Sequence, residues 1–130
     1  MDTTQLKRIP LFADASDEEL KKVAFFAQAK EVGEGTVVIN EGGFSRELFA
    51  IEDGTAEVTR DGEHVDDLNK GDIFGEVGML DNDMRNATVT ATSRMKLISM
   101  GHFEVKRLQK DAPGVYASIE AMVEERKGNK

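Results

Sequence analysis

The chain contains no cysteine and no tryptophan, and only 2 of its 130 residues are proline. The absence of cysteine excludes disulfide bonds, thiolate catalysis and cysteine metal ligands. No long uncharged hydrophobic run is present, so we expect no membrane-spanning helix. The opening residues MDTTQLKRIP also lack the apolar stretch of a secretory signal peptide. These absences favour a cytoplasmic protein.

Basic residues are in the minority, with 17 Lys and Arg against 25 Asp and Glu and a net charge of −8. Because nucleic acid binding depends on basic side chains that neutralise phosphates, we expect no nucleic acid partner. The histidines are His64 and His102 alone, whereas a metal enzyme requires clustered histidine and carboxylate ligands. No nucleophile, base and acid can be assembled at a recognisable spacing. We therefore expect neither a metal cofactor nor an enzymatic activity.

The length and composition suit one compact domain spanning residues 1–130. The N-terminal part is predicted to be helical. Ser16 and Glu19 have the spacing of a capping box, and an apolar stripe at helical spacing follows, formed by Leu20, Val23, Ala24 and Ala27. Upstream, Leu6 and Ile9 suggest a short helical turn that Pro10 ends.

From about Lys30 the pattern changes to short segments rich in β-branched and aromatic residues, separated by glycine. The predicted strands are residues 36–40, 47–53, 55–60, 63–68, a strand ending at 74, 87–92 and 95–100. Alternation is clear in 87–92, where alanine and valine occupy one face and threonine the other. Asp53-Gly54 and Asp61-Gly62 separate neighbouring segments, and Asp-Gly is a strong signal for a hairpin.

The C-terminal part returns to helix. A helix over 102–109 is expected to begin near Ser99 or Gly101, and a last helix near Asp111 as cap with Pro113 in its first turn. Its apolar stripe comprises Val115, Ile119, Met122 and Val123. The fold is thus predicted to be mainly β with flanking helices, and roughly eight short strands indicate a barrel or a two-sheet jelly roll.

Residues 74–92, FGEVGMLDNDMRNATVTAT, carry the main functional signal. Gly75 and Gly78 leave the backbone amides of a short helical start open to an anion, and Arg85 supplies a guanidinium that can bind phosphate. Glu76 can accept hydrogen bonds from ribose hydroxyls. Together these groups suggest a nucleotide site. Taken alone, however, the spacing favours a surface ion pair of Arg85 with Asp81 or Asp83, and a favourable charge at a helix N-terminus for Glu76.

The same stretch resembles the phosphate-binding cassette of cyclic-nucleotide-binding domains, the β-rolls of kinase regulatory subunits, gated channels and catabolite-activator-type regulators. FGEVGML and RNATV carry the resemblance, and IPLFADASDEEL and VGEGTVVINEGGFSRELFAIEDGTAEV extend it over nearly the whole chain. The resemblance implies an eight-stranded β-roll with an N-terminal helical segment and C-terminal helices. It also implies that cAMP or cGMP is the ligand.

The resemblance implies a role for each residue of the cassette. Glu76 and the backbone of Gly75 would bind the ribose 2′-hydroxyl, and Arg85 the cyclic phosphate, helped by amides near Gly78 and Asn86. The predicted ligand-binding residues are Gly75, Glu76, Val77, Gly78, Arg85, Asn86, Ala87 and Tyr116. Tyr116 is the predicted cap over the base, with packing in the core as the alternative.

Three departures from the family pattern bear on function. Met84 replaces a usual proline, and Asn86 replaces the alanine or threonine associated with cAMP or cGMP. No recognition helix, kinase or channel segment follows the last helix. We therefore expect a stand-alone sensor that binds cAMP in preference to cGMP and moves its C-terminal helix to signal to an effector protein. The alternative is a β-roll interaction module that no longer binds nucleotide.

Overall fold

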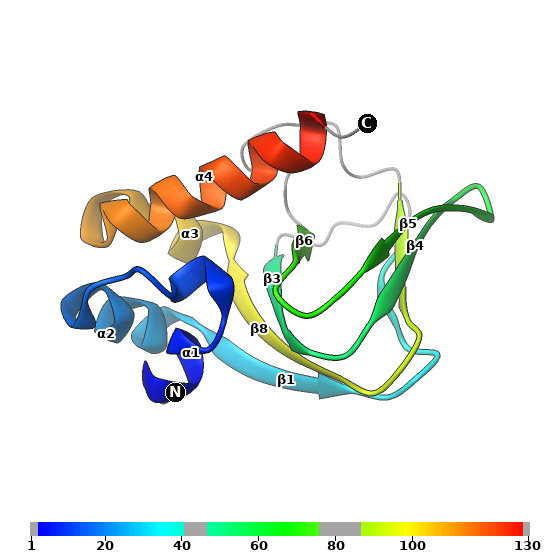
Figure 1. The fold of residues 1–130 in the computed structure, drawn as a ribbon, viewed down its shortest axis with the longest axis horizontal. Helices are drawn as coiled ribbons and strands as arrows, with labels where there is room; N and C mark the ends of the chain where they lie inside the picture. Colours follow the sequence, from blue (N-terminus) through cyan, green and yellow to red (C-terminus); the bar gives the residue numbers. More distant parts are fainter. Residues whose placement is uncertain (1–2, 41–46, 76–86, 129–130) are drawn as a thin grey trace.

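The computed structural model describes residues 3–40, 47–75 and 87–128, with side chains as far as Met122. Its helical elements are α1 (Thr3–Lys7), the 3-10 helix η1 (Pro10–Phe12), α2 (Asp17–Phe26), α3 (His102–Asp111) and α4 (Pro113–Gly128). Its strands are β1 (Gln28–Val32), β2 (Val37–Ile39), β3 (Glu47–Asp53), β4 (Ala56–Arg60), β5 (Glu63–Leu68), β6 (Ile73–Gly75), β7 (Thr88–Ala91) and β8 (Met95–Gly101). The N- and C-terminal helices gather at one end of the strands (Figure 1).

The strands form two four-stranded antiparallel sheets. The first sheet has the order β1-β8-β3-β6 and the second the order β2-β7-β4-β5. The chain passes from one sheet to the other between all consecutive strands except β4 and β5, so the two sheets enclose a roll (Figure 1). The predicted eight-stranded β-roll with helices at both ends of the chain is confirmed.

Two groups of buried side chains fill the interior. The roll cluster lies between the two sheets and includes Phe49, Phe74, Val89 and Leu97. The helical cluster lies between the helices and the outer face of the first sheet, and includes Leu20, Leu48, Leu108 and Ile119. The first sheet is therefore covered on both faces.

This double coverage explains two different sequence patterns. Along β3, Leu48 and Ala50 belong to the helical cluster while Phe49 and Ile51 belong to the roll cluster, so the four central residues of the strand are all apolar. In the second sheet only one face is covered. Residues 87, 89 and 91 are buried and the threonines between them are partly exposed, as the alternation predicted.

The two Asp-Gly pairs have different roles. Asp61 and Gly62, with φ of 53° and 81°, join the paired strands β4 and β5, so this predicted hairpin is confirmed. The prediction of a hairpin at Asp53-Gly54 is wrong, because β3 and β4 belong to different sheets and do not pair. There the chain turns a corner of the roll, and Gly54 packs against the backbone of Arg94 and Met95. The sequence signal marks a tight bend but does not say which strands will pair.

One strand, β1, was missed as a distinct element. It is the edge of the first sheet, and its residues are exposed or only half-buried. Its sequence, QAKEV, therefore lacks the apolar alternation that marks a half-buried strand. Its pairing with β8, from Gln28 opposite Ser99 to Val32 opposite Met95, defines it instead.

The helix boundaries agree with the sequence at most positions. Ser16 caps α2 by accepting from the Glu19 amide at 3.1 Å, Gly101 is the N-cap of α3, and Pro113 opens α4. Asp111, the predicted cap of the last helix, is instead the last residue of α3. Pro10 follows the end of α1 as predicted, and it also begins η1, because a proline suits the first position of a helical turn. Among the described residues, no helix is long and apolar enough to cross a membrane.

Candidate functional site

Gly75 marks the place where the predicted cassette leaves the first sheet. It is the last residue of β6, pairs with Leu48 of β3 and has φ of 101°, a region that side chains other than glycine rarely adopt. A Cβ at this position would lie 2.5 Å from the Glu47 carbonyl oxygen and 3.0 Å from the Phe49 ring. Conformation and space therefore both require glycine here.

Ala87 marks the place where the cassette enters the second sheet. It precedes β7, is buried, and belongs to the roll cluster together with Val89 and Ala91. The chain between Gly75 and Ala87 therefore connects the edge of the first sheet with an interior strand of the second. Of the predicted ligand-binding residues, Glu76, Val77, Gly78, Arg85 and Asn86 lie outside the described residues, so their proposed contacts stay predictions.

Beside Gly75 lies an aromatic pair in the roll cluster. The rings of Phe49 and Phe74 stack with centroids 5.1 Å apart and an angle of 18° between their planes. Phe49 and Phe74 face each other on neighbouring strands, because they are direct partners in the β3–β6 register. This packing fixes the end of β6, and with it the starting point of the cassette.

A charged pair near this end of the roll was not anticipated from the sequence. The Lys30 ammonium lies 2.7 Å from the Glu47 carboxylate and 5.6 Å from the centre of the Phe49 ring. Lys30 lies on the same face of β1 as Val32, which packs against the roll cluster. Both partners are 39% exposed, so the pair remains in contact with water. The signal available in the sequence was the spacing of two residues between Lys30 and Val32, which places both on one face of a strand.

Tyr116 lies in α4 and packs, partly buried, against the helical cluster. Burial and then the nearby carboxylate of Glu120 raise the pKa of the Tyr116 phenol above its usual value, because both disfavour the phenolate. The packing interpretation of this residue is thus supported. Its role as a cap over a nucleotide base stays a prediction.

An acidic side chain of α2 links the N-terminal helices to α4. The Glu19 carboxylate accepts hydrogen bonds from the amides of Gly114 at 2.8 Å and Val115 at 3.4 Å. These amides belong to the first turn of α4, where backbone N–H groups have no partner within the helix. The predicted capping box is therefore realised in one direction: Ser16 binds the Glu19 amide, while the Glu19 side chain caps a different helix.

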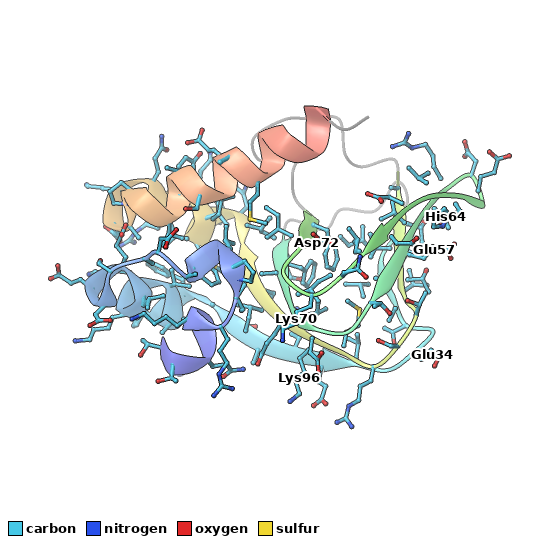
Figure 2. All side chains as sticks on the ribbon, in the orientation of Figure 1. Glu34, Glu57, His64, Lys70, Asp72 and Lys96 are labelled. Atoms are coloured by element: carbon cyan, nitrogen blue, oxygen red, sulfur yellow. The ribbon has the colours of Figure 1, made fainter. Side chains whose placement is uncertain are left out.

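The two histidines lie on different elements, His64 in β5 and His102 at the start of α3. His64, on the β4–β5 hairpin, has Nδ1 2.8 Å from Glu57 Oε2 and Nε2 3.5 Å from Asp67 Oδ2 (Figure 2). The hydrogen bond to Glu57 is the main cause that raises the pKa of His64 above its usual value of 6.5. Among the described residues, no group of three or more histidines and carboxylates is arranged to hold a metal ion.

Comparison with known sequences relates the chain to one family. The family model described as "Cyclic nucleotide-binding domain" matches residues 29–111. The chain is 39% identical over 105 residues to the cAMP-dependent protein kinase regulatory subunit of Yarrowia lipolytica, covering 79% of this chain and 28% of that protein. It is 35% identical over 104 residues to the subunit of the same name from Schizosaccharomyces pombe, covering 79% and 25%. The chain thus spans about a quarter of the length of these curated relatives.

Solved structures share the fold. A cAMP-bound structure of PfPKA-R superposes with a TM-score of 0.74 at 26% identity, over 97% of this chain and 46% of that chain. A putative cyclic nucleotide-binding protein from Geobacter metallireducens superposes with a TM-score of 0.81 at 18% identity, over 96% of this chain and 94% of that chain. At the lower identity the likeness shows the fold alone.

Proposed function

Because the chain belongs to the cyclic nucleotide-binding domain family, we propose that it is a regulatory sensor of cAMP. The observation that carries this proposal is the family match over residues 29–111, which includes both Glu76 and Arg85. A roll that had lost its ligand would have no need of a carboxylate and a guanidinium at these positions. The described frame supports the site, since Gly75 and Ala87 hold the two ends of the cassette at the two sheets.

In the proposed complex, Glu76 and the Gly75 backbone bind the ribose 2′-hydroxyl, and Arg85 binds the cyclic phosphate. Amides near Gly78 and Asn86 complete the phosphate contacts, as unpaired backbone N–H groups at the start of a helical turn bind anions readily. Val77 and Ala87 flank these contacts along the chain. A charged hydrogen bond of this kind contributes about 1.5–3 kcal/mol, so the arginine is expected to dominate the affinity.

The choice of cAMP over cGMP rests on the relatives. The curated relatives are named as cAMP-dependent kinase regulatory subunits, and the PfPKA-R structure is described as cAMP-bound. Asn86 offers both a donor and an acceptor, and so does not by itself select either base. The names of the relatives also suggest the class of output, which is the control of an effector protein.

We place the moving part of the sensor in α4. Tyr116 and Met122 of this helix are only partly buried, while its first turn is held by Glu19. A base that contacts Tyr116 would shift the later turns of α4 about this held end. The size of the shift in population is set by the ligand's difference in affinity for the two positions of the helix.

The first experiment is thermal unfolding with cAMP and with cGMP. Ligand at about one hundred times its dissociation constant adds roughly 2.7 kcal/mol to the free energy of unfolding, which raises the Tm of a domain of this size by several degrees. We expect a larger shift with cAMP. No shift with millimolar amounts of either nucleotide would identify the chain as an interaction module that has lost its ligand.

The residue-level test is Arg85→Ala, which we expect to remove the thermal shift while the unliganded protein stays folded. Arg94→Ala is the matched control, because Arg94 is exposed on the turn before β8 and pairs with Glu31. The control should respond to cAMP as the unchanged protein does. Full-strength binding by Arg85→Ala would refute the residue assignment even if the nucleotide were the right ligand.

A further inference from the structure

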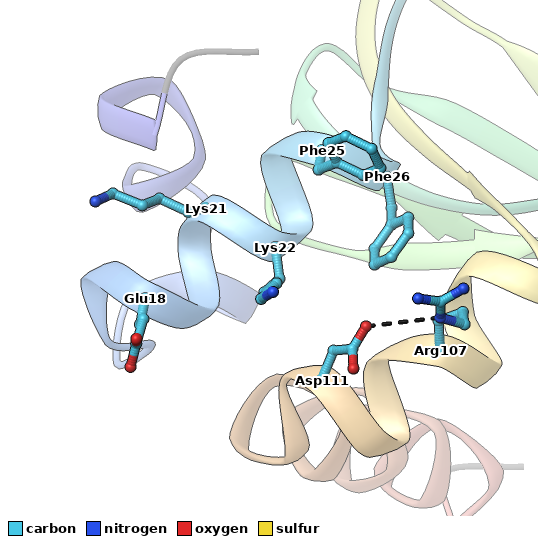
Figure 3. A pocket seen from close by; sticks show the side chains of 7 residues that line it. All are labelled: Glu18, Lys21, Lys22, Phe25, Phe26, Arg107 and Asp111. Atoms are coloured by element: carbon cyan, nitrogen blue, oxygen red, sulfur yellow. Dashed lines mark ion pairs between the residues drawn. The ribbon is translucent and has the colours of Figure 1, made fainter.

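A groove between α2 and α3, at the helical end of the molecule, lies apart from the cassette. It has a volume of about 470 Å³ and is open to solvent on one side. Lys21, Lys22, Phe25 and Phe26 line it from α2, and Arg107 and Asp111 line it from α3 (Figure 3). None of these residues belongs to the predicted nucleotide site, so the groove is free for another role.

Aromatic side chains make this surface unusually apolar. Phe25 is 83% exposed and contacts Phe26 edge to face, with the ring centres 5.4 Å apart. Phe103, which is 76% exposed, is the second residue of α3. It lies four residues before Arg107 and so on the same face of that helix as the groove arginine. Two large phenylalanines left in water at the facing ends of neighbouring helices indicate an interaction surface rather than scattered exposed residues.

Cationic side chains slightly outnumber acidic ones in the groove, whereas acidic residues outnumber basic ones in the whole chain. The protein carries a net charge of −8, yet three of the groove side chains are cationic and two, Glu18 and Asp111, are acidic. Arg107 lies 3.6 Å from Asp111 and 5.7 Å above the Phe26 ring. In the part of the chain that the structure describes, Lys21 and Lys22 have no carboxylate partner. The Lys22 side chain lies toward the groove, whereas the Lys21 side chain extends from its rim away from α3 (Figure 3).

We propose that this groove docks a segment of a partner protein in which a large apolar residue is flanked by carboxylates. The apolar residue would pack on Phe25 and Phe26, because this contact would remove apolar surface of all three side chains from water. One carboxylate would pair with Lys22 in the groove and another with Lys21 at its rim, and so the charge pattern would select against basic segments. The surface is separate from the nucleotide site, so the proposal stands independently of cAMP binding.

The test is selection from a random 16-residue peptide display library on the whole chain. We expect the enriched peptides to share an aromatic or aliphatic anchor with aspartate or glutamate on either side. Binding of these peptides, measured by fluorescence anisotropy, should weaken at least tenfold in Phe25→Ser and in Lys22→Glu. Both side chains are exposed, so these variants should keep the Tm of the unchanged protein.

Lys96→Glu is the control for charge alone, because Lys96 is an exposed lysine at the opposite end of β8 from α3 (Figure 2). It should bind the peptides within a factor of two of the unchanged protein. The proposal is overturned if the enriched peptides carry no acidic bias, or if they bind the groove variants as tightly as the control. It is also overturned if sedimentation shows that Phe25 holds two copies of this chain together.

Discussion

At the scale of single residues, glycine at position 75 performs a task that no other residue can. The strand β6 must end beside β3 and turn at once into the cassette, and the backbone does so at φ of 101°. The Glu47 carbonyl oxygen and the Phe49 ring then occupy the space that a side chain would need. The first residue of the proposed ligand site is thus fixed by the packing of two strands.

The variant Gly75→Ala tests this reasoning. We expect it to lower the free energy of unfolding by more than the 1–3 kcal/mol or so that a strained backbone conformation costs, because the new Cβ also meets backbone atoms. Gly62→Ala is the control, since Gly62 has φ of 81° with no atom within 4 Å of the added Cβ, so strain alone should appear there. Urea denaturation measures the free energy of unfolding of both variants. Equal losses in the two variants would show that close packing at Gly75 contributes nothing.

At the scale of elements, the contact that joins α2 to α4 is a side chain binding a helix end. The Glu19 carboxylate accepts from two amides of the first turn of α4, and a negative charge there also interacts favourably with the helix dipole. Gly114 leaves room for this contact, because an added Cβ would lie 2.8 Å from Glu19 Oε1 and would displace the end of that side chain. The N-terminal helices therefore hold the start of the element that we propose to move.

The change Glu19→Gln removes the charge and keeps most of the shape. We expect a loss of about 1 kcal/mol in the free energy of unfolding, as for a partly exposed charged cap. Faster hydrogen exchange at the Gly114 and Val115 amides should accompany it. Glu18→Gln is the control, because Glu18 is the neighbouring acid of α2 and binds neither amide. Unchanged exchange at both amides would show that Glu19 does not hold α4.

At the scale of the whole molecule, one sheet belongs to both cores. β3 sends Leu48 and Ala50 into the helical cluster and Phe49 and Ile51 into the roll cluster, and β8 divides its residues in the same way. Because neither cluster can lose this sheet without exposing the other, we expect the roll and the helices to unfold together.

The variant Ile51→Ala tests this coupling. It creates a cavity on the roll side of β3, and such a truncation of a buried residue costs about 2–5 kcal/mol. Tyr116 is the single tyrosine and the chain has no tryptophan, so tyrosine fluorescence reports on α4 alone. The fluorescence and far-ultraviolet circular dichroism transitions should shift together. The control Val65→Ala, at an exposed position, should shift neither of these transitions. A fluorescence transition separate from the circular dichroism transition would show that the roll and the helices do not unfold together.

Much of the fold could be predicted from the sequence, because local patterns carry it. Strand β7 alternates since one of its faces meets water, and residues 48–51 of β3 are all apolar since neither face of the strand does at these positions. The capping Ser16 and the turn at Asp61 and Gly62 follow from backbone groups within a few residues. The cassette motif between Gly75 and Ala87 was also visible as a pattern of residue types, and its family was confirmed by comparison.

Tertiary structure alone decided the partners of each element. The bend at Asp53-Gly54 was visible, but the sheet that β4 would join was not, because strand pairing depends on contacts far apart in the sequence. The Glu19 carboxylate could cap its own helix or another one, and it bound the amides of the distant helix α4. Lys30 of β1 paired with Glu47 of β3 over the intervening strand β8 of the same sheet. The sequence determined which segments would be strands, helices and turns, since these depend on neighbours in the chain. Only folding could place them against one another.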